Sequence, residues 1–201
     1  KLNAVTLNGI VAETLSTPNE ALDGPPWRHA DLEGLGGWIF SEIAKLCRRH
    51  PINHFITTGH GSGGVLTGAD PDGAHGAAAL PMIDYEQDLP ADVAAAYAPL
   101  AGSFQDRGSA IMQSSTHQAR QMLWMMRAEP KAFAAARWFL NVPQYWAWRL
   151  SGVAASEFSI MGAQSHLWNV VERRFTPIVV SQGWDHLMPP FAHAGAALGP
   201  V

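Results

Sequence analysis

The sequence predicts an α/β domain in which helices flank a mixed sheet with antiparallel hairpins. Two alternating apolar runs in residues 1–14 surround Asn8-Gly9, the dipeptide typical of a type I′ hairpin. Apolar residues then recur at three- and four-residue spacing over residues 31–46, which predicts an amphipathic helix that Pro51 must end. Residues 52–58 (INHFITT) resemble a strand. A strand placed after a hairpin and a helix suggests that the helix crosses over a mixed sheet.

Composition sets the limits on class. The chain has 201 residues and 21.7 kDa, and its 47% hydrophobic content is enough for a real core in one large or two small domains. Charged residues make up only 15%, and the formal charge of -4 argues against a nucleic-acid partner, which would need a basic face.

Location follows from the cysteine and from hydropathy. One cysteine, Cys47, rules out an internal disulfide, so a cytoplasmic location is the default expectation. We expect no membrane association, because no apolar run approaches the roughly 20 residues of a membrane span. The chain starts at Lys1 rather than Met, and we expect it to be a piece of a longer polypeptide.

The middle of the chain reads as a connection, a second hairpin and a short helix. Residues 17–28 carry three prolines and predict a surface connection. An apolar run at 65–69 is closed by Asp-Pro-Asp-Gly, and residues 77–85 would return as the second strand. Pro90 then opens a short Ala-rich helix, and residues 100–114 predict a loop.

The second half is predicted to be mainly helical. Periodicity and breakers favour helices over residues 116–127, 131–142 and 143–150, the last stopped by Ser151-Gly152. Tyr145, Trp146 and Trp148 on the third helix could stack on a sugar, but side chains of this kind more often build core. The methionines of residues 122–126 fall at helical spacing, which is typical of packing.

The densest motif is TTGHGSGGVL, residues 57–66. Gly59, Gly61 and Gly64 satisfy G-x-G-x-x-G, which raises a dinucleotide site and a nicotinamide-dependent oxidoreductase as one alternative. That fingerprint needs a helix directly after its glycines, whereas here a turn sequence follows within ten residues. A serine-hydrolase elbow also fails, because His60 stands where that motif needs glycine.

Metal binding receives little support. His50 and His54 have a zinc-like spacing, but Pro51 lies between them and no cysteine or second pair supports them. Solvated or capping roles explain both residues more simply. The other histidines are scattered and form no recognisable ligand set.

Two polar clusters remain that neighbouring strands could bring together. His60 and Ser62 lie in the glycine loop, and Asp84, Tyr85 and Glu86 lie in PMIDYEQ. Carboxylates beside an imidazole suit a polyol, because each hydroxyl both donates and accepts hydrogen bonds. The spacing leaves an alternative open, namely that the two acids only end a strand in a solvated turn.

The order of motifs carries a resemblance that no single motif does. Hairpin, helix, strand and glycine loop are followed by VLTGADPDG, PMIDYE, MLWMMRAEPKAF, QYWAWRLSG, SEFSIMG, SHLWN, GW and MPP. This series resembles the N-terminal domain of the FGGY carbohydrate kinases over nearly the whole chain, residues 1–201. The resemblance implies a ribonuclease-H-like, actin-like ATPase fold and transfer of the ATP γ-phosphoryl group to a hydroxyl of a ketose, aldose or polyol.

The resemblance also implies roles for particular residues. The family's substrate contacts map onto His60 to Ser62 and onto Asp84; we add Glu86 by proximity, and Gln118. The cofactors would be ATP and Mg²⁺, bound mainly outside this segment, with Lys1 as the one candidate contact within it. The catalytic aspartate would lie beyond Val201, so the segment alone should not catalyse transfer.

Departures from the family pattern leave further questions open. Many members have Trp-x-Asp-x-Arg where this chain has Met82, Asp84 and Glu86, so the sugar cannot be carried over. A non-catalytic sugar-binding or regulatory module of the same fold is a second alternative. The expected partners are a small-molecule sugar and, in a homodimer, a second copy of the chain.

Overall fold

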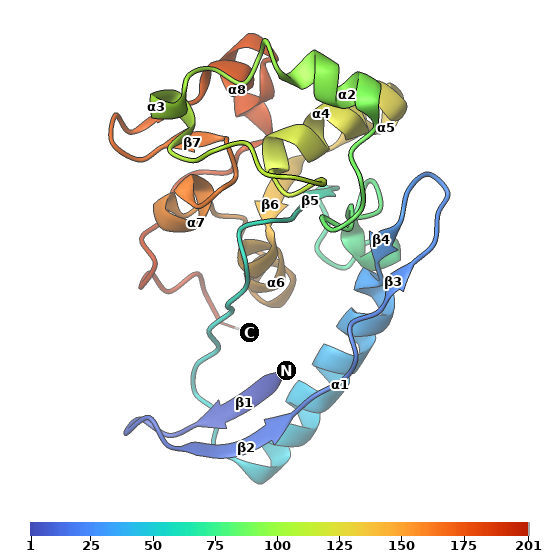
Figure 1. Ribbon diagram of the computed structural model, residues 1–201. Helices are drawn as coiled ribbons and strands as arrows, with labels where there is room; N and C mark the ends of the chain where they lie inside the picture. The colour runs from blue at the N-terminus through green and yellow to red at the C-terminus, as the bar shows by residue number, and fades with distance from the viewer. Residues whose placement is uncertain (201) are drawn as a thin grey trace.

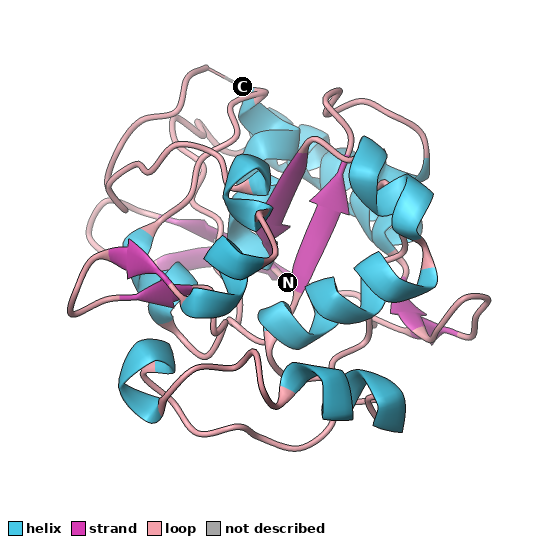
Figure 2. Ribbon diagram, turned by 90° about the horizontal axis from the view of Figure 1, so that it is seen from above, coloured by secondary structure: helices cyan, strands magenta, loops and turns pink. Residues whose placement is uncertain are grey.

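The computed structural model describes residues 1–200, which form an α/β arrangement of helices and short antiparallel strand pairs. β5 and β6 lie in the middle, with α2, α4 and α8 above them and α6 below in Figure 1. Seen from above, this central pair has helices on both sides (Figure 2). The strand pairs are β1 (Leu2–Val5) with β2 (Val11–Leu15), β3 (Ala21–Leu22) with β4 (His29–Ala30), β5 (Gly64–Thr67) with β6 (Trp138–Asn141), and β7 (Trp168–Asn169) with β8 (Arg174–Phe175).

The helices are mostly short. They are α1 (Leu32–Arg49), α2 (Ala91–Tyr97), α3 (Phe104–Arg107), α4 (Gln118–Ala128), α5 (Pro130–Ala135), α6 (Val142–Ser151), α7 (Phe158–Gly162) and α8 (Pro177–Ser181), with 3₁₀ turns η1 (His75–Ala77) and η2 (Trp184–Leu187). Within residues 1–200, none of these helices combines the length and apolar character needed to cross a bilayer.

The N-terminal hairpin is confirmed, but its turn is not of type I′. A type I′ turn needs two positive φ angles, and only Gly9, at φ +79°, supplies one. The hairpin is tied to the end of α1 by Glu13, whose carboxylate accepts hydrogen bonds from Arg49 Nη2 at 2.6 Å and is paired with His50 Nε2 at 2.7 Å.

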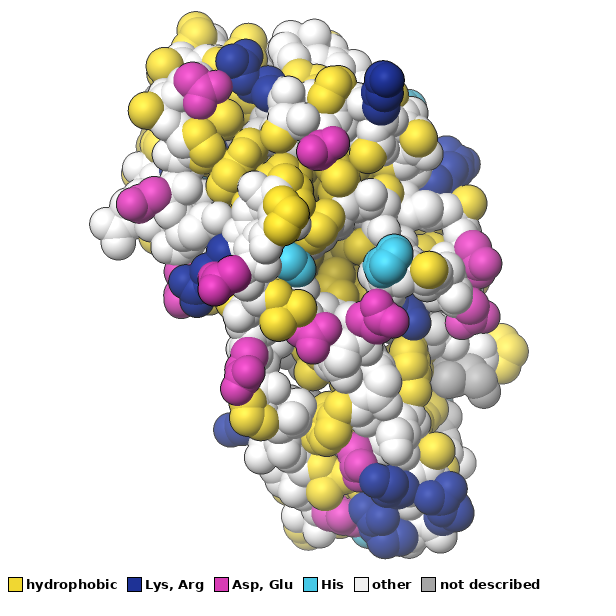
Figure 3. All heavy atoms as spheres, turned by 90° about the vertical axis from the view of Figure 1, so that its right-hand side faces the viewer, with side chains coloured by type: hydrophobic (Ala, Val, Ile, Leu, Met, Phe, Trp, Pro, Cys, Tyr) yellow, Lys and Arg dark blue, Asp and Glu magenta, His cyan; other side chains and the backbone are white. Residues whose placement is uncertain are grey.

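The helix predicted from residue 31 is confirmed as α1. Asp31 caps it by accepting a hydrogen bond from the Gly34 amide at 2.8 Å, and the helix ends just before Pro51. Arg48 and Arg49 lie in the last turn, where the helix dipole favours cations. Lys and Arg side chains gather at this end of the molecule (Figure 3).

The strand predicted over residues 52–58 is wrong. Ile52 donates to the His50 carbonyl at 2.9 Å, but residues 53–60 make no backbone hydrogen bond to any other part of the described chain. The apolar side chain of Ile56 is 88% exposed. Alternation predicts which side chains share a face, but a strand exists only where a neighbour pairs with it, and here the segment is extended without one.

The second half contains the other errors. Residues 131–142 are not one helix: α5 ends at Ala135, and β6 follows and pairs with β5, burying Phe139 and Leu140. The returning strand at 77–85 is reduced to isolated bridges, because positive φ angles at 75–77 turn the backbone. The single mixed sheet is therefore replaced, in residues 1–200, by four separate antiparallel pairs.

The remaining predictions agree better with the structure. Helices α2, α4 and α6 lie close to the predicted ranges, while the predicted connection at 17–28 and loop at 100–114 also contain β3 and α3. The core assignment of the aromatic triplet and the methionines is confirmed, because Tyr145, Trp148, Met122 and Met125 are fully buried.

Candidate functional site

The glycine loop, residues 59–63, joins the extended segment to β5. Its glycines are required by packing against the protein itself. A Cβ at Gly61 would lie 2.4 Å from the Ala163 carbonyl oxygen, and a Cβ at Gly63 would lie 2.6 Å from Met82 Cε. Glycine often lets a ligand approach the backbone closely, but here protein atoms lie against these two positions.

The dinucleotide interpretation fails on this loop. β5 begins at Gly64, so a strand follows the glycines where the fingerprint needs a helix N-terminus. The Ala79 amide then donates to the Leu66 carbonyl at 2.8 Å, which closes the predicted hairpin through a short return. The glycine loop therefore lacks the strand-turn-helix context on which the nicotinamide-dependent alternative depends.

The glycine loop and the turn at 84–86 do come together. The His60 and Tyr85 rings lie with centroids 4.7 Å apart, tilted by 57°. Burial lowers the pKa of His60 below 6.5, although the charge of Glu86 acts in the opposite direction. His60 is therefore neutral at pH 7.

The tautomer of His60 follows from its neighbour. The Ser62 amide N–H donates to His60 Nδ1 at 3.3 Å, so Nδ1 is the acceptor. The proton of the neutral ring then lies on Nε2, which remains a hydrogen-bond donor. One side of the imidazole is exposed to solvent and can meet a ligand.

Asp84 is held by a cation from a distant part of the chain. Arg28 Nε lies 3.1 Å from Asp84 Oδ2, with the Asp84 side chain 12% exposed and that of Arg28 49% exposed. The other carboxylate oxygen accepts from the Glu86 amide at 3.0 Å. Arg28 thus supplies beside Asp84 the kind of charge that the family motif has at the position of Glu86.

Gln87 fixes this pairing. Its Nε2 donates to the Arg28 carbonyl at 2.5 Å and to the Asp84 carbonyl at 3.0 Å, and its Oε1 accepts from the Arg28 amide at 3.2 Å. Neither Arg28 nor Gln87 is signalled by the sequence, because Arg28 lies in the proline-rich connection and reaches the site only through the fold.

Gln118 lies underneath the glycine loop. Its Nε2 donates to the carbonyls of Gly61 and Gly63, at 2.9 and 3.1 Å, and its Oε1 accepts from Asn141 Nδ2 at 2.8 Å. The side chain is fully buried, so its amide is engaged by protein groups. Gln121, one turn later on α4, donates to the carbonyl of Ser62 at 2.7 Å.

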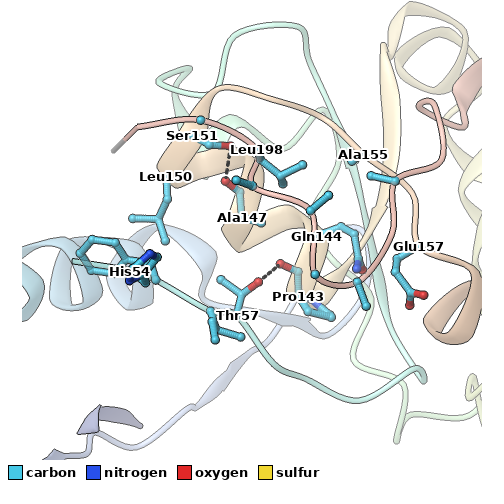
Figure 4. A pocket seen from close by; sticks show the side chains of 18 of the residues that line it. His54, Thr57, Pro143, Gln144, Ala147, Leu150, Ser151, Ala155, Glu157 and Leu198 are labelled. Carbon is cyan, nitrogen blue, oxygen red and sulfur yellow. Dashed lines mark hydrogen bonds between the residues drawn. The ribbon is translucent and has the colours of Figure 1, made fainter. Parts of the chain in front are cut away.

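A pocket of about 800 Å³ lies elsewhere, beside the extended segment (Figure 4). Residues 52–59 form one wall, and α6, residues 155–160 and the tail at 192–200 form the rest. Thr57 Oγ1 donates to the Pro143 carbonyl at 2.7 Å across it. None of the five predicted substrate residues lines this pocket, which reaches the loop only at Gly59.

The remaining predicted positions lie apart from the site. Lys1 is exposed at the start of β1. His50 is paired with Glu13, whereas His54 lines the pocket. Across residues 1–200, no three His, Cys, Asp or Glu side chains are grouped so that they could hold a metal ion.

Two histidines that seemed scattered are stacked in the interior. The rings of His117 and His166 lie 3.6 Å apart and are both buried. The Met112 amide donates to His117 Nε2 at 2.8 Å, so His117 Nδ1 carries the proton and donates to the Gln164 carbonyl at 2.6 Å. His166 Nδ1 lies 2.6 Å from the Tyr97 hydroxyl.

Both histidines are held neutral. Burial lowers the pKa of His166 to about 3, and the neighbouring His117 and Arg107 act in the same direction. Burial also lowers the pKa of His117. His117 is the N-cap residue of α4, the helix that carries Gln118 and Gln121, and His166 stacks on it from the segment between α7 and β7.

Comparison with solved structures places this architecture among carbohydrate kinases. A carbohydrate kinase from Novosphingobium aromaticivorans matches 98% of the chain with a TM-score of 0.88 and 29% identity. Xylulose kinase from Rhodospirillum rubrum (18% identity) and gluconate kinase from Lactobacillus acidophilus (12%) each match 94% with a TM-score of 0.70. The resemblance predicted from the order of motifs is thereby confirmed, consistent with an FGGY-family carbohydrate kinase.

The chain covers less than half the length of the kinases that it matches. The chain spans 41% of the length of the Novosphingobium kinase and 40% of the Rhodospirillum kinase. No protein-family model matches the chain, and no curated protein matches it either.

Proposed function

We propose that the chain is the sugar-binding part of an ATP-dependent carbohydrate kinase with the actin-like, ribonuclease-H-like fold. The observation that carries the proposal is the contact of His60 with the Tyr85–Glu86 turn, in a chain that matches a carbohydrate kinase with a TM-score of 0.88. The substrate would be a ketose, aldose or polyol.

Each side chain would have a distinct task toward the sugar. The His60 Nε2–H donates to a hydroxyl oxygen, and the Ser62 hydroxyl can both donate and accept. Asp84, held beside Arg28, and Glu86 accept from sugar hydroxyls. Donors and acceptors side by side are what a polyhydroxylated ligand needs, because each of its hydroxyls has both functions.

We propose that ATP and Mg²⁺ are held mainly by parts of the protein outside residues 1–201. When bound, they supply the phosphoryl group and neutralise charge as it moves. Among the described residues, Lys1 is the one candidate contact. The catalytic aspartate would also lie outside this segment.

One alternative keeps the sugar and removes the chemistry. A non-catalytic sugar-binding or regulatory module would use the same glycine loop and the same turn at 84–86. The departure that favours it is Glu86, which stands where the family motif has arginine. An intact downstream carboxylate and ATP site in the natural protein would exclude this alternative.

The test is an ATP-consumption screen of the full-length natural protein across pentoses, hexoses, ketoses and polyols. Xylulose and gluconate belong in the panel because two structural neighbours are kinases of those compounds. The proposal expects consumption with at least one polyhydroxylated compound. Binding of a sugar without consumption would favour the regulatory module, and failure to bind any of them would overturn both.

A further inference from the structure

We propose that Gln118 and Gln121 on α4 are positioning residues that fix the backbone of the glycine loop and aim His60 at the sugar. This inference rests on the proposed function, because it assigns what prepares the loop for that ligand. It also gives Gln118 a role underneath the site instead of a direct contact.

The contacts cover three consecutive peptide units. Gln118 Nε2 donates to the carbonyls of Gly61 and Gly63, and Gln121 Nε2 donates to the carbonyl of Ser62 between them. The orientation of both amides is unambiguous, since each nitrogen faces two carbonyl oxygens. Both side chains are fully buried, so solvent does not compete for these hydrogen bonds.

The orientation of the loop follows from peptide geometry. In a trans peptide the N–H points opposite to the C=O of the same unit. Because the carbonyls of Gly61 and Ser62 point to α4, the amide N–H groups of Ser62 and Gly63 point away from it. The Ser62 N–H is the group that meets His60 Nδ1, which leaves Nε2–H as the free donor of the ring.

Gln121 also joins the two halves of the site. Its second hydrogen bond goes to the Ser115 carbonyl at 2.6 Å, and the Ser115 amide donates to the Tyr85 carbonyl at 3.1 Å. A continuous chain of hydrogen bonds therefore runs from Ser62 through Gln121 and Ser115 to Tyr85, whose ring packs on His60. The spacing between loop and turn is set by this one side chain.

An apolar side chain cannot replace it. A methionine at position 121 would fill about the same volume but would leave the carbonyls of Ser62 and Ser115 without their donor, and the loss of a hydrogen bond to a buried carbonyl such as that of Ser115 is destabilising. The loop could relieve this only by rotating its peptides toward solvent, and His60 would turn with them. Loss of the amide should therefore act on loop geometry and on sugar affinity together.

The experiment compares Gln121→Met with Met125→Ala, a cavity substitution on the same helix at a fully buried apolar side chain, which removes no hydrogen bond to the loop. In the full-length protein we expect Gln121→Met to speed amide hydrogen exchange at residues 60–64 and to raise KM for the accepted sugar about tenfold each, with KM for ATP unchanged. Met125→Ala should lower global stability without either local effect. Gln121→Asn, which keeps the amide but shortens its reach, is the milder variant and should fall between wild type and Gln121→Met.

If both variants at position 121 show wild-type exchange at residues 60–64, the proposal that the glutamines fix the loop backbone is overturned. Faster exchange with an unchanged KM for the sugar would overturn the role of Gln121 in positioning His60. The exchange measurement needs no sugar, so it also separates the two proposals. If the wild-type protein consumes ATP with none of the sugars tested, the proposed kinase function is overturned. The exchange result still decides whether the glutamines fix the loop.

Discussion

Residues 52–58 and residues 60–64 are neighbours in the chain and opposites in structure. The first segment has the alternating pattern of a strand but lies extended with no backbone partner in the described chain beyond the Ile52 contact to His50. The second contains three glycines, yet three successive carbonyls are bound by buried glutamine amides. Order in this part of the molecule is thus set by tertiary partners rather than by local propensity.

The same difference separates the two places where a ligand could bind. The extended segment lines the pocket of about 800 Å³, whereas the braced loop carries His60 to the turn at 84–86. A preorganised site costs less ordering when its ligand binds. The proposed sugar contacts therefore stay with the glycine loop and the turn at 84–86, and not with that pocket.

Lowering the pH should have the largest effect on the difference in order between residues 60–64 and residues 52–58. His117 and His166 are neutral in the folded state, and their pKa values there lie below the roughly 6.5 of an unfolded histidine. The unfolded state therefore binds more protons below about pH 6.5, so the stability contribution of both histidines is present above that pH and is lost as pH falls, for His166 down to about pH 3. For His166, whose folded-state pKa is about 3, we expect the loss to approach about 1.4 kcal/mol per pH unit between these two pH values.

Urea unfolding between pH 7 and pH 4.5 measures this slope. His166→Phe should flatten the pH dependence, whereas His186→Gln, at an exposed histidine, should leave it unchanged. Because His117 is the N-cap residue of α4, hydrogen exchange at residues 60–64 should rise with acid before that at residues 52–58 changes. An identical pH slope in wild type and His166→Phe would contradict the assignment.

Gly61→Ala should come next. Its Cβ would meet a backbone carbonyl at 2.4 Å, and a backbone group cannot move aside as a flexible side chain can. We expect a loss near the upper end of the about 1–3 kcal/mol typical of overpacking, measured by chemical denaturation. Gly68→Ala, where a Cβ meets nothing within 4 Å, is the control and should be nearly neutral. Equal stability of the two variants would mean that the loop is not tightly packed.

Asp84→Ala should act on function more than on stability. Loss of a charged acceptor should raise KM for the accepted sugar about tenfold or more while kcat changes little. The matched control is Asp92→Ala, which breaks an exposed ion pair with Arg127 and belongs neither to the glycine loop nor to the turn at 84–86. Steady-state kinetics of the full-length protein decide the matter, and wild-type KM and kcat in Asp84→Ala would remove Asp84 from the site.

The smallest effect is expected in the extended segment itself. Ile56→Thr changes a side chain that is 88% exposed, so the free energy of unfolding should stay within about 0.5 kcal/mol of wild type. Val65→Thr, at a side chain that is fully buried in β5, should lower the free energy of unfolding clearly more, because it buries a hydroxyl. A large loss at Ile56 would show that this segment is packed in solution.

The sequence predicted the elements whose signals are local. Asp31 with the apolar spacing after it defines α1, and Asn8-Gly9 marks the first hairpin even though its turn type was wrong. The errors fall where distant partners decide: β6 exists because β5 lies beside it, and residues 52–58 lack such a neighbour. A three-residue glutamine spacing on α4 was visible in the sequence but gave no sign of what it would bind.

The candidate site divides in the same way. The approach of His60 to the 84–86 turn was predictable, because a short return separates the loop from the turn. Arg28 was not, since its place beside Asp84 depends on how the proline-rich connection folds back. The roles of His60, Ser62, Asp84, Glu86 and Gln118 toward a sugar stay predictions.

Hydrogen exchange of the full-length protein with and without its accepted sugar, in the absence of ATP, tests the central assignment most directly. We predict slower exchange at residues 60–64 and 84–86, with residues 52–58 unchanged. Protection of residues 52–58 alone, with the loop and the turn unaffected, would place the ligand in the larger pocket and contradict the site described above.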